Sequence, residues 1–183
     1  MSKISREKRK NIIGYTVTLL VIAALALLML LLPRWRRARM QAELDATPHE
    51  PGACKLIGCD VTPADEFREA YVDYYYDSQY IPESLQAKRA GEVAAIVYYT
   101  TGSDEMGGAY KSSSGGSVDA SRERIEVRIV RRSDGETLAE KTFRASMPSS
   151  AKVGAGQGVY GSVEDADVTA WVRGVYDERW FVE

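Results

Sequence analysis

IIGYTVTLLVIAALALLMLLL, at residues 12–32, is the stretch that decides how the rest of this chain is interpreted. It holds 21 residues and contains neither a charged residue nor a proline. A helix of that length spans about 31 Å, close to the ~30 Å hydrocarbon core of a bilayer, and it satisfies its own backbone hydrogen bonds. The run therefore predicts a transmembrane helix, and we expect a single-pass membrane protein with membrane lipid as one partner.

Basic residues flank the run on both sides and predict anchors at the membrane interface. The expected anchors are Lys8, Arg9, Lys10, Arg34, Trp35, Arg36 and Arg37. The short basic tail, residues 1–11, favours a signal-anchor with the N-terminus in the cytoplasm and the C-terminal domain outside the cell membrane. The arginines that follow the run leave the opposite orientation, with a cytoplasmic domain, as the alternative. The run exceeds the length of a signal-peptide h-region, and no A-x-A site follows it.

The charge balance differs between the two parts of the chain. Residues 1–40 carry nine Lys/Arg and one acid, whereas residues 41–183 carry 15 Lys/Arg and 25 Asp/Glu, which gives net charges of +8 and −10. An acidic domain does not favour nucleic-acid binding, because that function needs a basic face. We therefore expect no nucleic-acid partner.

The remaining chain divides by composition into a juxtamembrane linker, residues 33–59, and one α+β domain, residues 60–183. The linker ends in the pair Cys54 and Cys59, which are the only cysteines. In an oxidising compartment such a pair predicts a structural disulfide. Free thiols and a functional pair are the alternatives, although the C-x-x-C spacing of redox motifs is absent.

Three segments of the domain carry clear secondary-structure patterns. Residues 92–101 are apolar and β-branched, as in a buried strand, and residues 124–144 alternate around Asp134-Gly135, as in a hairpin. A capped apolar stripe predicts a helix at 163–177, and similar spacing predicts another at 63–76. The expected fold class is α+β, with an antiparallel sheet and both helices packed on one face, after the transmembrane helix.

Aromatic residues mark two candidate interaction surfaces. The run YVDYYYDSQY, residues 71–80, is rich in tyrosine, and two aromatics stand near the end of the sequence. Tyrosine and tryptophan are frequent in protein interfaces, although packing into the core gives the same pattern. The candidates for an interaction surface are Tyr75, Tyr76, Tyr80, Trp180 and Phe181.

A search for catalytic chemistry finds no motif with the required residues and spacing. The chain has one histidine, His49, in the linker, and it lacks P-loop, H-E-x-x-H and EF-hand patterns. We therefore expect no enzyme, no metal and no cofactor. The predicted function is a membrane-anchored, non-catalytic interaction module, an accessory subunit of a membrane or envelope assembly with a protein partner. The alternative is a tethered ligand-binding or redox domain that uses the glycine-rich loops, among them residues 102–116, or Cys54 and Cys59.

Overall fold

The computed structural model describes residues 3–62, 71–106, 110–111, 116–147 and 158–180. The chain divides into two compact units, Met1–Ala42 and Glu43–Glu183. Most of one long helix makes up the first unit. The second holds a six-stranded sheet and a second helix.

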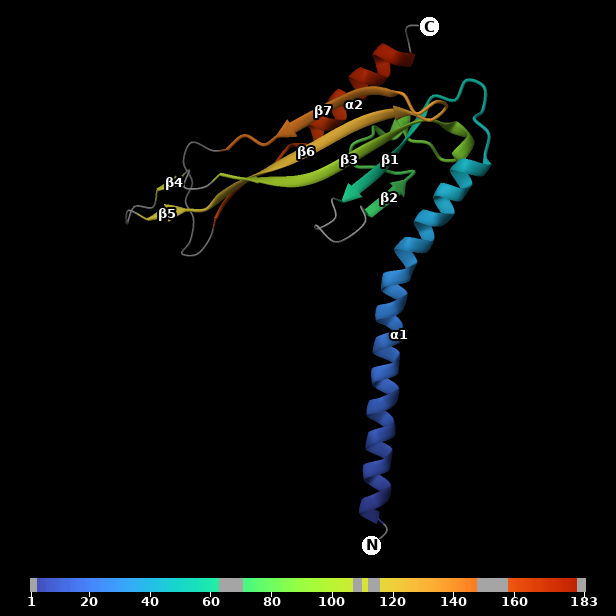
Figure 1. The fold of residues 1–183 in the computed structure, drawn as a ribbon, viewed down its shortest axis with the longest axis vertical. Helices are drawn as coiled ribbons and strands as arrows, with labels where there is room; N and C mark the ends of the chain where they lie inside the picture. The colour runs from blue at the N-terminus through green and yellow to red at the C-terminus, as the bar shows by residue number, and fades with distance from the viewer. Residues whose placement is uncertain (1–2, 63–70, 107–109, 112–115, 148–157, 181–183) are drawn as a thin grey trace. The chain divides into compact units, whose positions relative to one another are not determined.

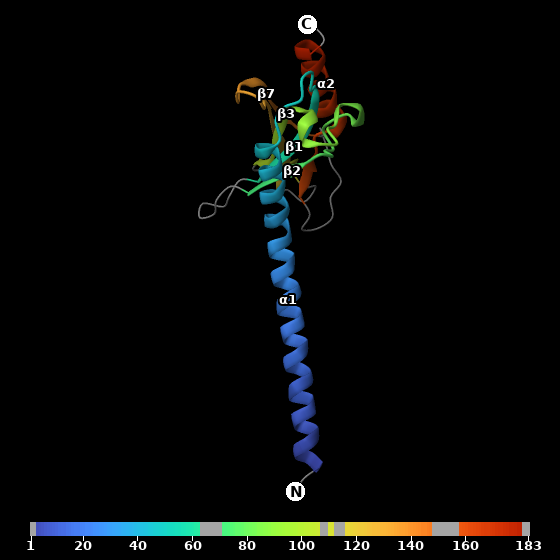
Figure 2. The ribbon, with the colours of Figure 1, turned by 90° about the vertical axis from the view of Figure 1, so that its right-hand side faces the viewer.

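Helix α1 (Lys3–Ala46) is 44 residues long and continuous, as Figures 1 and 2 show. It extends beyond residues 12–32 on both sides, so the charged residues of both flanks belong to the same helix. Among the described residues, no helix combines the length and apolar character that crossing a membrane requires. This finding corrects the predicted transmembrane helix and the single-pass, signal-anchor description that depended on it. The predicted location of the two ends of the chain is not tested and stays a prediction.

The sheet of the second unit contains both parallel and antiparallel pairs. Its strands are β1 (Lys55–Thr62), β2 (Tyr71–Tyr75), β3 (Val93–Glu105), β6 (Ala120–Arg131), β7 (Thr137–Arg144) and β8 (Val159–Gly161). The order is β2-β1-β3-β6-β7, with β8 paired to β6. The β1–β3 and β6–β8 pairs are parallel and the others antiparallel, which corrects the predicted antiparallel sheet to a mixed α/β arrangement.

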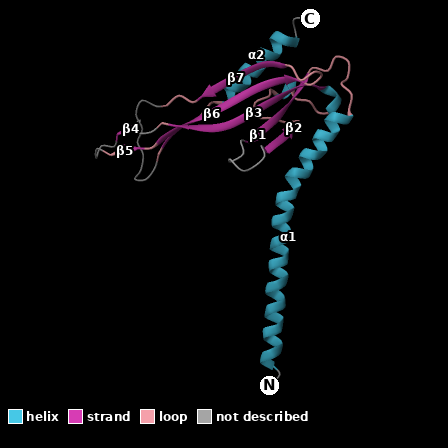
Figure 3. Ribbon diagram, in the orientation of Figure 1, coloured by secondary structure: helices cyan, strands magenta, loops and turns pink. Residues whose placement is uncertain are grey.

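Short elements complete the unit. Two 3₁₀ turns, η1 (Glu83–Leu85) and η2 (Ala90–Glu92), precede β3. Beyond the far end of the long β3–β6 pair, β4 (Tyr110–Lys111) and β5 (Ser117–Val118) form a separate two-stranded sheet (Figure 3).

The predicted strand and hairpin are confirmed. Strand β3 covers residues 92–101 almost completely and continues to Glu105, while β6 and β7 form the hairpin around Gly135. Gly135 has a φ of 75°, the left-handed conformation that glycine adopts most easily. The ladder pairs Ile125 with Phe143 and Ile129 with Ala139, so the apolar positions of both strands share one face.

The predicted helix at 63–76 is wrong in the part that the structure describes. Residues Tyr71–Tyr75 form β2, paired antiparallel with β1 over Gly58–Thr62, and residues 63–70 lie outside the described residues. Tyrosine and valine have high strand propensity, and the edge of β1 offers them backbone partners. The i, i+3, i+4 spacing of the aromatics is therefore not a helical stripe.

The core lies between the sheet and helix α2 (Asp165–Trp180), which covers one face and confirms the predicted helix at 163–177. Val168 and Val172 of α2 are fully buried with Val97, Ile125 and Ile129 of the sheet. Trp171 is only partly buried. Its ring meets that of Phe143 edge to face, with centroids 5.9 Å apart.

The predicted disulfide between Cys54 and Cys59 is also wrong, because both cysteines are free. Cys54 packs against the core under α2, where it is hydrogen-bonded to the Tyr176 hydroxyl. Cys59 lies inside β1 and pairs with Tyr74 and Tyr98. Five residues of extended chain separate two Cα atoms by roughly 16 Å, more than twice the span of a disulfide. An odd separation also points the two side chains to opposite faces of the sheet.

Candidate functional site

The face of the sheet opposite α2 carries a row of polar side chains. Strand alternation sends Ile125, Val127 and Ile129 into the core, so the intervening residues of β6 point to the other face. The ladder places Tyr98 and Thr100 of β3 on one side of this row and residues of β7 on the other. We call the part of this surface over β3, β6 and β7 the uncovered face, defined by Tyr98, Thr100, Arg122, Arg124, Glu126, Arg128, Glu140, Thr142 and Arg144.

A groove of about 590 Å³ lies on the uncovered face. Its lining comes from four neighbouring strands and consists of Val61, Tyr98, Thr100, Glu126, Val127, Arg128, Glu140, Lys141 and Thr142. The Lys141 ammonium lies 4.7 Å from the Phe143 ring centroid, on the α2 side. The charged side chains left on the groove side are therefore Glu126, Glu140 and Arg128. The volume lies within the range of ligand pockets and suits a peptide segment of a few residues.

Arg128 and two tyrosines form a fixed cluster beside this groove. The Arg128 guanidinium carbon lies 5.6 Å from the Tyr98 ring centroid, a cation–π geometry that holds the long side chain against the sheet. The Tyr98 hydroxyl is hydrogen-bonded to the Tyr74 hydroxyl, and burial raises the pKa of both phenols. Both hydroxyl groups therefore stay protonated at neutral pH. The cluster presents a preorganised cation together with hydrogen-bonding hydroxyl groups.

The charges of the groove are mixed and partly paired. Glu126 forms an ion pair with Arg124, in which the Arg124 Nε and Glu126 Oε1 atoms are 3.0 Å apart. Glu126, Arg128 and Glu140 are all exposed to solvent. Side chains of both signs suit a polypeptide, which offers charges of both signs and backbone hydrogen-bonding groups. They do not favour a polyanion.

The tyrosines predicted as an interaction surface have different surroundings. Tyr75 is 38% exposed, and its hydroxyl donates a hydrogen bond to Asp73 Oδ2 at 2.9 Å. Tyr76 donates to Glu43 Oε1 at 2.9 Å, and burial together with this bond raises its pKa to about 12. Tyr80 is buried in the core, edge to face with Tyr99 at 4.9 Å between centroids. Of these three tyrosines, Tyr75 is therefore the one at the surface.

The other predicted site residues fall partly outside the described side chains. Trp180 ends α2, but its side chain and the whole of Phe181 are not described. The predicted interface anchors Lys8, Arg9, Lys10, Arg34, Trp35, Arg36 and Arg37 all lie within α1. Of these, Trp35 and Arg36 have described side chains, and both are exposed, with Arg39 stacked 5.6 Å from the Trp35 ring centroid.

The cysteine chemistry of the alternative function has little support in this geometry. Cys59 is fully buried, and burial, followed by the nearby Asp60 and Asp73 carboxylates, raises its pKa to about 12. A thiol with that pKa holds almost no thiolate at neutral pH, and the thiolate is the reactive form. No group of three or more potential metal ligands gathers among the described residues.

The sequence held a signal for this site that its motifs did not reveal. The alternation of RERIEVRIV places Arg124, Glu126 and Arg128 on one face as clearly as it places the apolar residues on the other. A polar strand face usually contacts only solvent, so the pattern alone did not distinguish a groove. The Tyr98–Arg128 contact depends on pairing between strands 30 residues apart.

Comparison of this chain with protein-family models, with curated proteins and with solved structures finds no match.

Proposed function

We propose that this protein is a non-catalytic interaction module, an accessory subunit of a larger assembly, and that the groove on the uncovered face receives a segment of a protein partner. The observation that carries the proposal is the Arg128 guanidinium held over the Tyr98 ring at the groove. Arginine and tyrosine are the residue types that contribute most binding energy in protein interfaces. Here both are positioned before any partner binds, which reduces the entropy lost on binding.

The composition of the groove supports a peptide over other ligand classes. Hydroxyl groups of Tyr98, Thr100 and Thr142 line it and suit the backbone N–H and C=O groups of an extended segment. Val61 adds apolar surface at one side. Glu126 is paired with Arg124, which leaves Glu140 and Arg128 as one charge of each sign, so we expect the bound segment to carry both a basic and an acidic side chain.

Site-directed photo-crosslinking in cells tests the proposal. A photo-reactive residue at Thr142 lines the groove, whereas one at Ser133, in the exposed turn between β6 and β7, lies outside it. We expect Thr142 to give a defined cross-linked protein that Ser133 does not give. Adding Arg128→Ala should reduce that product by about 30-fold if the arginine contributes ~2 kcal/mol to binding.

The Arg128→Ala variant is expected to fold normally. Arg128 is exposed, so the substitution should change the free energy of unfolding by less than about 0.5 kcal/mol. Equal cross-linking from Thr142 and Ser133, or a Thr142 product that persists at full yield in the Arg128→Ala protein, would contradict the proposed groove.

A further inference from the structure

Three arginines surround one carboxylate at the end of the uncovered face. The Oδ1 atom of Asp104 in β3 lies 2.7 Å from Nη1 of Arg124, and its Oδ2 atom lies 3.3 Å from Nε of Arg144 and 3.4 Å from Nε of Arg122. Its Oδ2 atom is shared between Arg122 and Arg144, while Oδ1 accepts the hydrogen bond from Arg124. We call these residues the arginine cluster. The residues of the arginine cluster occupy positions in the sheet other than those of Tyr98 and Arg128.

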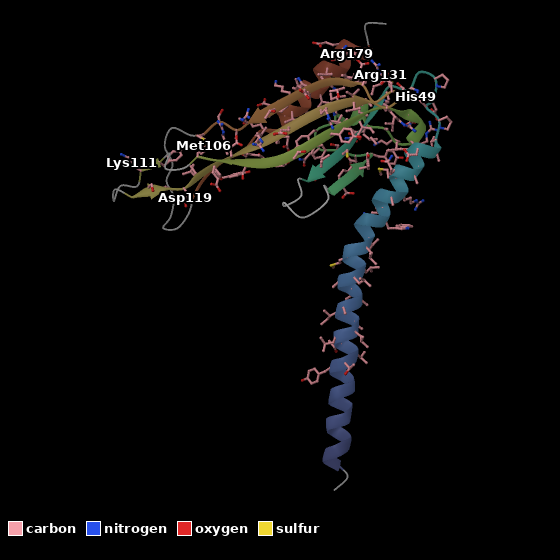
Figure 4. The ribbon with its side chains drawn as sticks, viewed as in Figure 1. His49, Met106, Lys111, Asp119, Arg131 and Arg179 are labelled. Carbon is pink, nitrogen blue, oxygen red and sulfur yellow. The ribbon has the colours of Figure 1, made fainter. Side chains whose placement is uncertain are left out.

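The backbone positions the cluster. Arg122 stands directly opposite Asp104 in the β3–β6 ladder, and Arg124 stands opposite Gly102. A Cβ atom at Gly102 would lie 3.4 Å from the Arg124 guanidinium, so the glycine lets this side chain lie close over β3 and reach Asp104. Met106 and Asp119, which flank this end of β3 and β6, are labelled in Figure 4 far from Arg131 at the other end of the hairpin.

The cluster carries more positive than negative charge. Arg124 and Arg144 stand directly opposite each other in the β6–β7 ladder, a like-charge pair that destabilises a sheet unless an anion compensates it. Asp104 and Glu126 supply two carboxylates for three guanidinium groups. The pKa of Asp104 reflects this surplus. Partial burial raises it, but Arg124, Arg144 and Arg122 together lower it below its usual value.

One guanidinium donor of the cluster has no hydrogen-bond partner within the described residues. It is the Nε atom of Arg122, which is buried and whose contact with Asp104 lacks hydrogen-bond geometry. The three arginine side chains are nonetheless 32%, 36% and 50% exposed, so a ligand can reach the guanidinium groups from solvent. Guanidinium groups bind carboxylate and phosphate through paired, parallel hydrogen bonds.

We propose that the arginine cluster, formed by Arg122, Arg124 and Arg144, binds an oxyanion, a carboxylate or a phosphate group, beside Asp104. A second anion compensates the surplus positive charge and accepts the remaining guanidinium hydrogen bonds. The site continues the groove along β3 and β6, but it does not depend on a partner in that groove. Its ligand is either a free anion or an acidic group of a larger molecule.

Titration of the full-length protein with small oxyanions tests this site. The Nε–Hε signals of arginine, observed by ¹⁵N NMR at constant ionic strength, report each guanidinium group. We expect saturable shifts of Arg122 and Arg144 on addition of inorganic phosphate or N-acetylglutamate. Arg131 is the internal control, because its guanidinium already pairs with Asp134 and Glu136. Saturation by phosphate alone identifies a phosphate ligand, and saturation by N-acetylglutamate identifies a carboxylate ligand.

Matched variants separate binding from structure. Arg122→Gln should weaken the anion affinity by about tenfold, whereas Arg131→Gln, at the other end of the hairpin, should leave it unchanged. Arg144→Gln removes the most exposed member of the cluster and should weaken the anion affinity by a similar factor. It replaces Arg122→Gln in the test if that variant folds poorly. Shifts at Arg122 and Arg144 no larger than those at Arg131 would overturn the oxyanion site. That outcome would not contradict the proposed function of the groove, because that function is tested separately through Thr142 and Arg128.

Discussion

Cys54 and Cys59 show how one strand separates two residues that are close in sequence. Cys54 is partly exposed, while the Cys59 side chain is fully buried with a pKa of about 12. We expect native protein to contain two free thiols. A thiol-specific reagent should modify Cys54 much faster than Cys59, because Cys59 becomes accessible only when the domain opens.

Mass spectrometry after timed alkylation measures these two rates. Alkylation in denaturant, where both thiols are exposed, is the control and should modify the two residues at similar rates. A peptide with Cys54 and Cys59 joined under non-reducing conditions would contradict the prediction.

Asp60 and Asp73 form a second notable contact at the residue scale. They stand directly opposite each other in the β1–β2 ladder, and burial, followed by the Asp73 charge, raises the pKa of Asp60. A carboxyl group whose pKa is raised by folding contributes stability below its unfolded pKa of about 3.9 and loses it as the pH rises through the folded value. At neutral pH the ionised Asp60 therefore destabilises the domain.

The substitution Asp60→Asn is expected to stabilise the protein at pH 7 by roughly 0.2–1 kcal/mol, the usual cost of like charges placed directly opposite in a sheet. The gain should shrink as the pH falls towards 3.5, because the native carboxyl group is then neutral as well. Denaturant unfolding at several pH values measures this difference. A gain that does not vary with pH would show that the burial of the ionised Asp60 carboxylate and its repulsion by Asp73 are not its cause.

At the scale of elements, β3, β6, β7 and α2 were predictable because each carries a strong local signal. The β6–β7 hairpin combines strict alternation with Asp134-Gly135, and α2 combines a cap with an apolar stripe. Strand β1 was not predicted. Its sequence KLIGCDVT contains a glycine and an aspartate, and the predicted boundary between linker and domain, after residue 59, falls inside it. Its place in the sheet comes from parallel pairing with β3, a long-range contact that no local pattern encodes.

Arg132 contacts the residues at the C-terminal end of α1 that belong to the second unit. Arg132, just after β6, donates hydrogen bonds to the carbonyl oxygens of Leu44, Thr47 and Ala90, with the Thr47 contact at 2.6 Å. Carbonyl groups at a helix C-terminus lack partners within the helix, and a cation there also interacts favourably with the helix dipole. Arg132 therefore satisfies the carbonyl groups at the C-terminal end of α1 within the second unit.

Replacing this arginine should cost far more stability than replacing its neighbour. Arg132→Ala is expected to lower the free energy of unfolding by roughly 2–4 kcal/mol, because it leaves partly buried carbonyl groups without donors. Arg131→Ala is the matched control and should cost less than about 0.5 kcal/mol, since Arg131 makes surface ion pairs. Thermal and denaturant unfolding measure both variants. Similar losses in the two proteins would exclude the proposed role of Arg132.

At the scale of the whole molecule, the core belongs entirely to the second unit. Every residue of the main apolar cluster lies between Leu56 and Tyr176. By contrast, thirteen of the large apolar side chains exposed among the described residues belong to α1, between Tyr15 and Trp35. The groove and the arginine cluster were not predictable at this scale, because both arise where β3, β6 and β7 meet.

A fragment with residues 43–183 should therefore fold by itself. It keeps the core, and it also keeps Glu43, Leu44 and Thr47, which contact Tyr76 and Arg132. We expect it to unfold in one cooperative transition with a midpoint close to that of the domain in the full-length protein. It should also be more soluble, because it lacks the long exposed apolar surface of α1.

A shorter fragment, residues 53–183, shows whether the end of α1 is part of the folded domain. It lacks Glu43, Leu44 and Thr47, so Tyr76 loses its partner and Arg132 keeps only the carbonyl oxygen of Ala90, while the main apolar cluster is unchanged. This fragment should be less stable than 43–183 by roughly 2–4 kcal/mol. Adding Arg132→Ala to it should cost less than the same substitution costs in 43–183, because the two changes share two of the three contacts of Arg132. Additive losses would show that Arg132 stabilises the domain through some other contact, and a fragment 43–183 without cooperative unfolding would show that the domain needs more of α1.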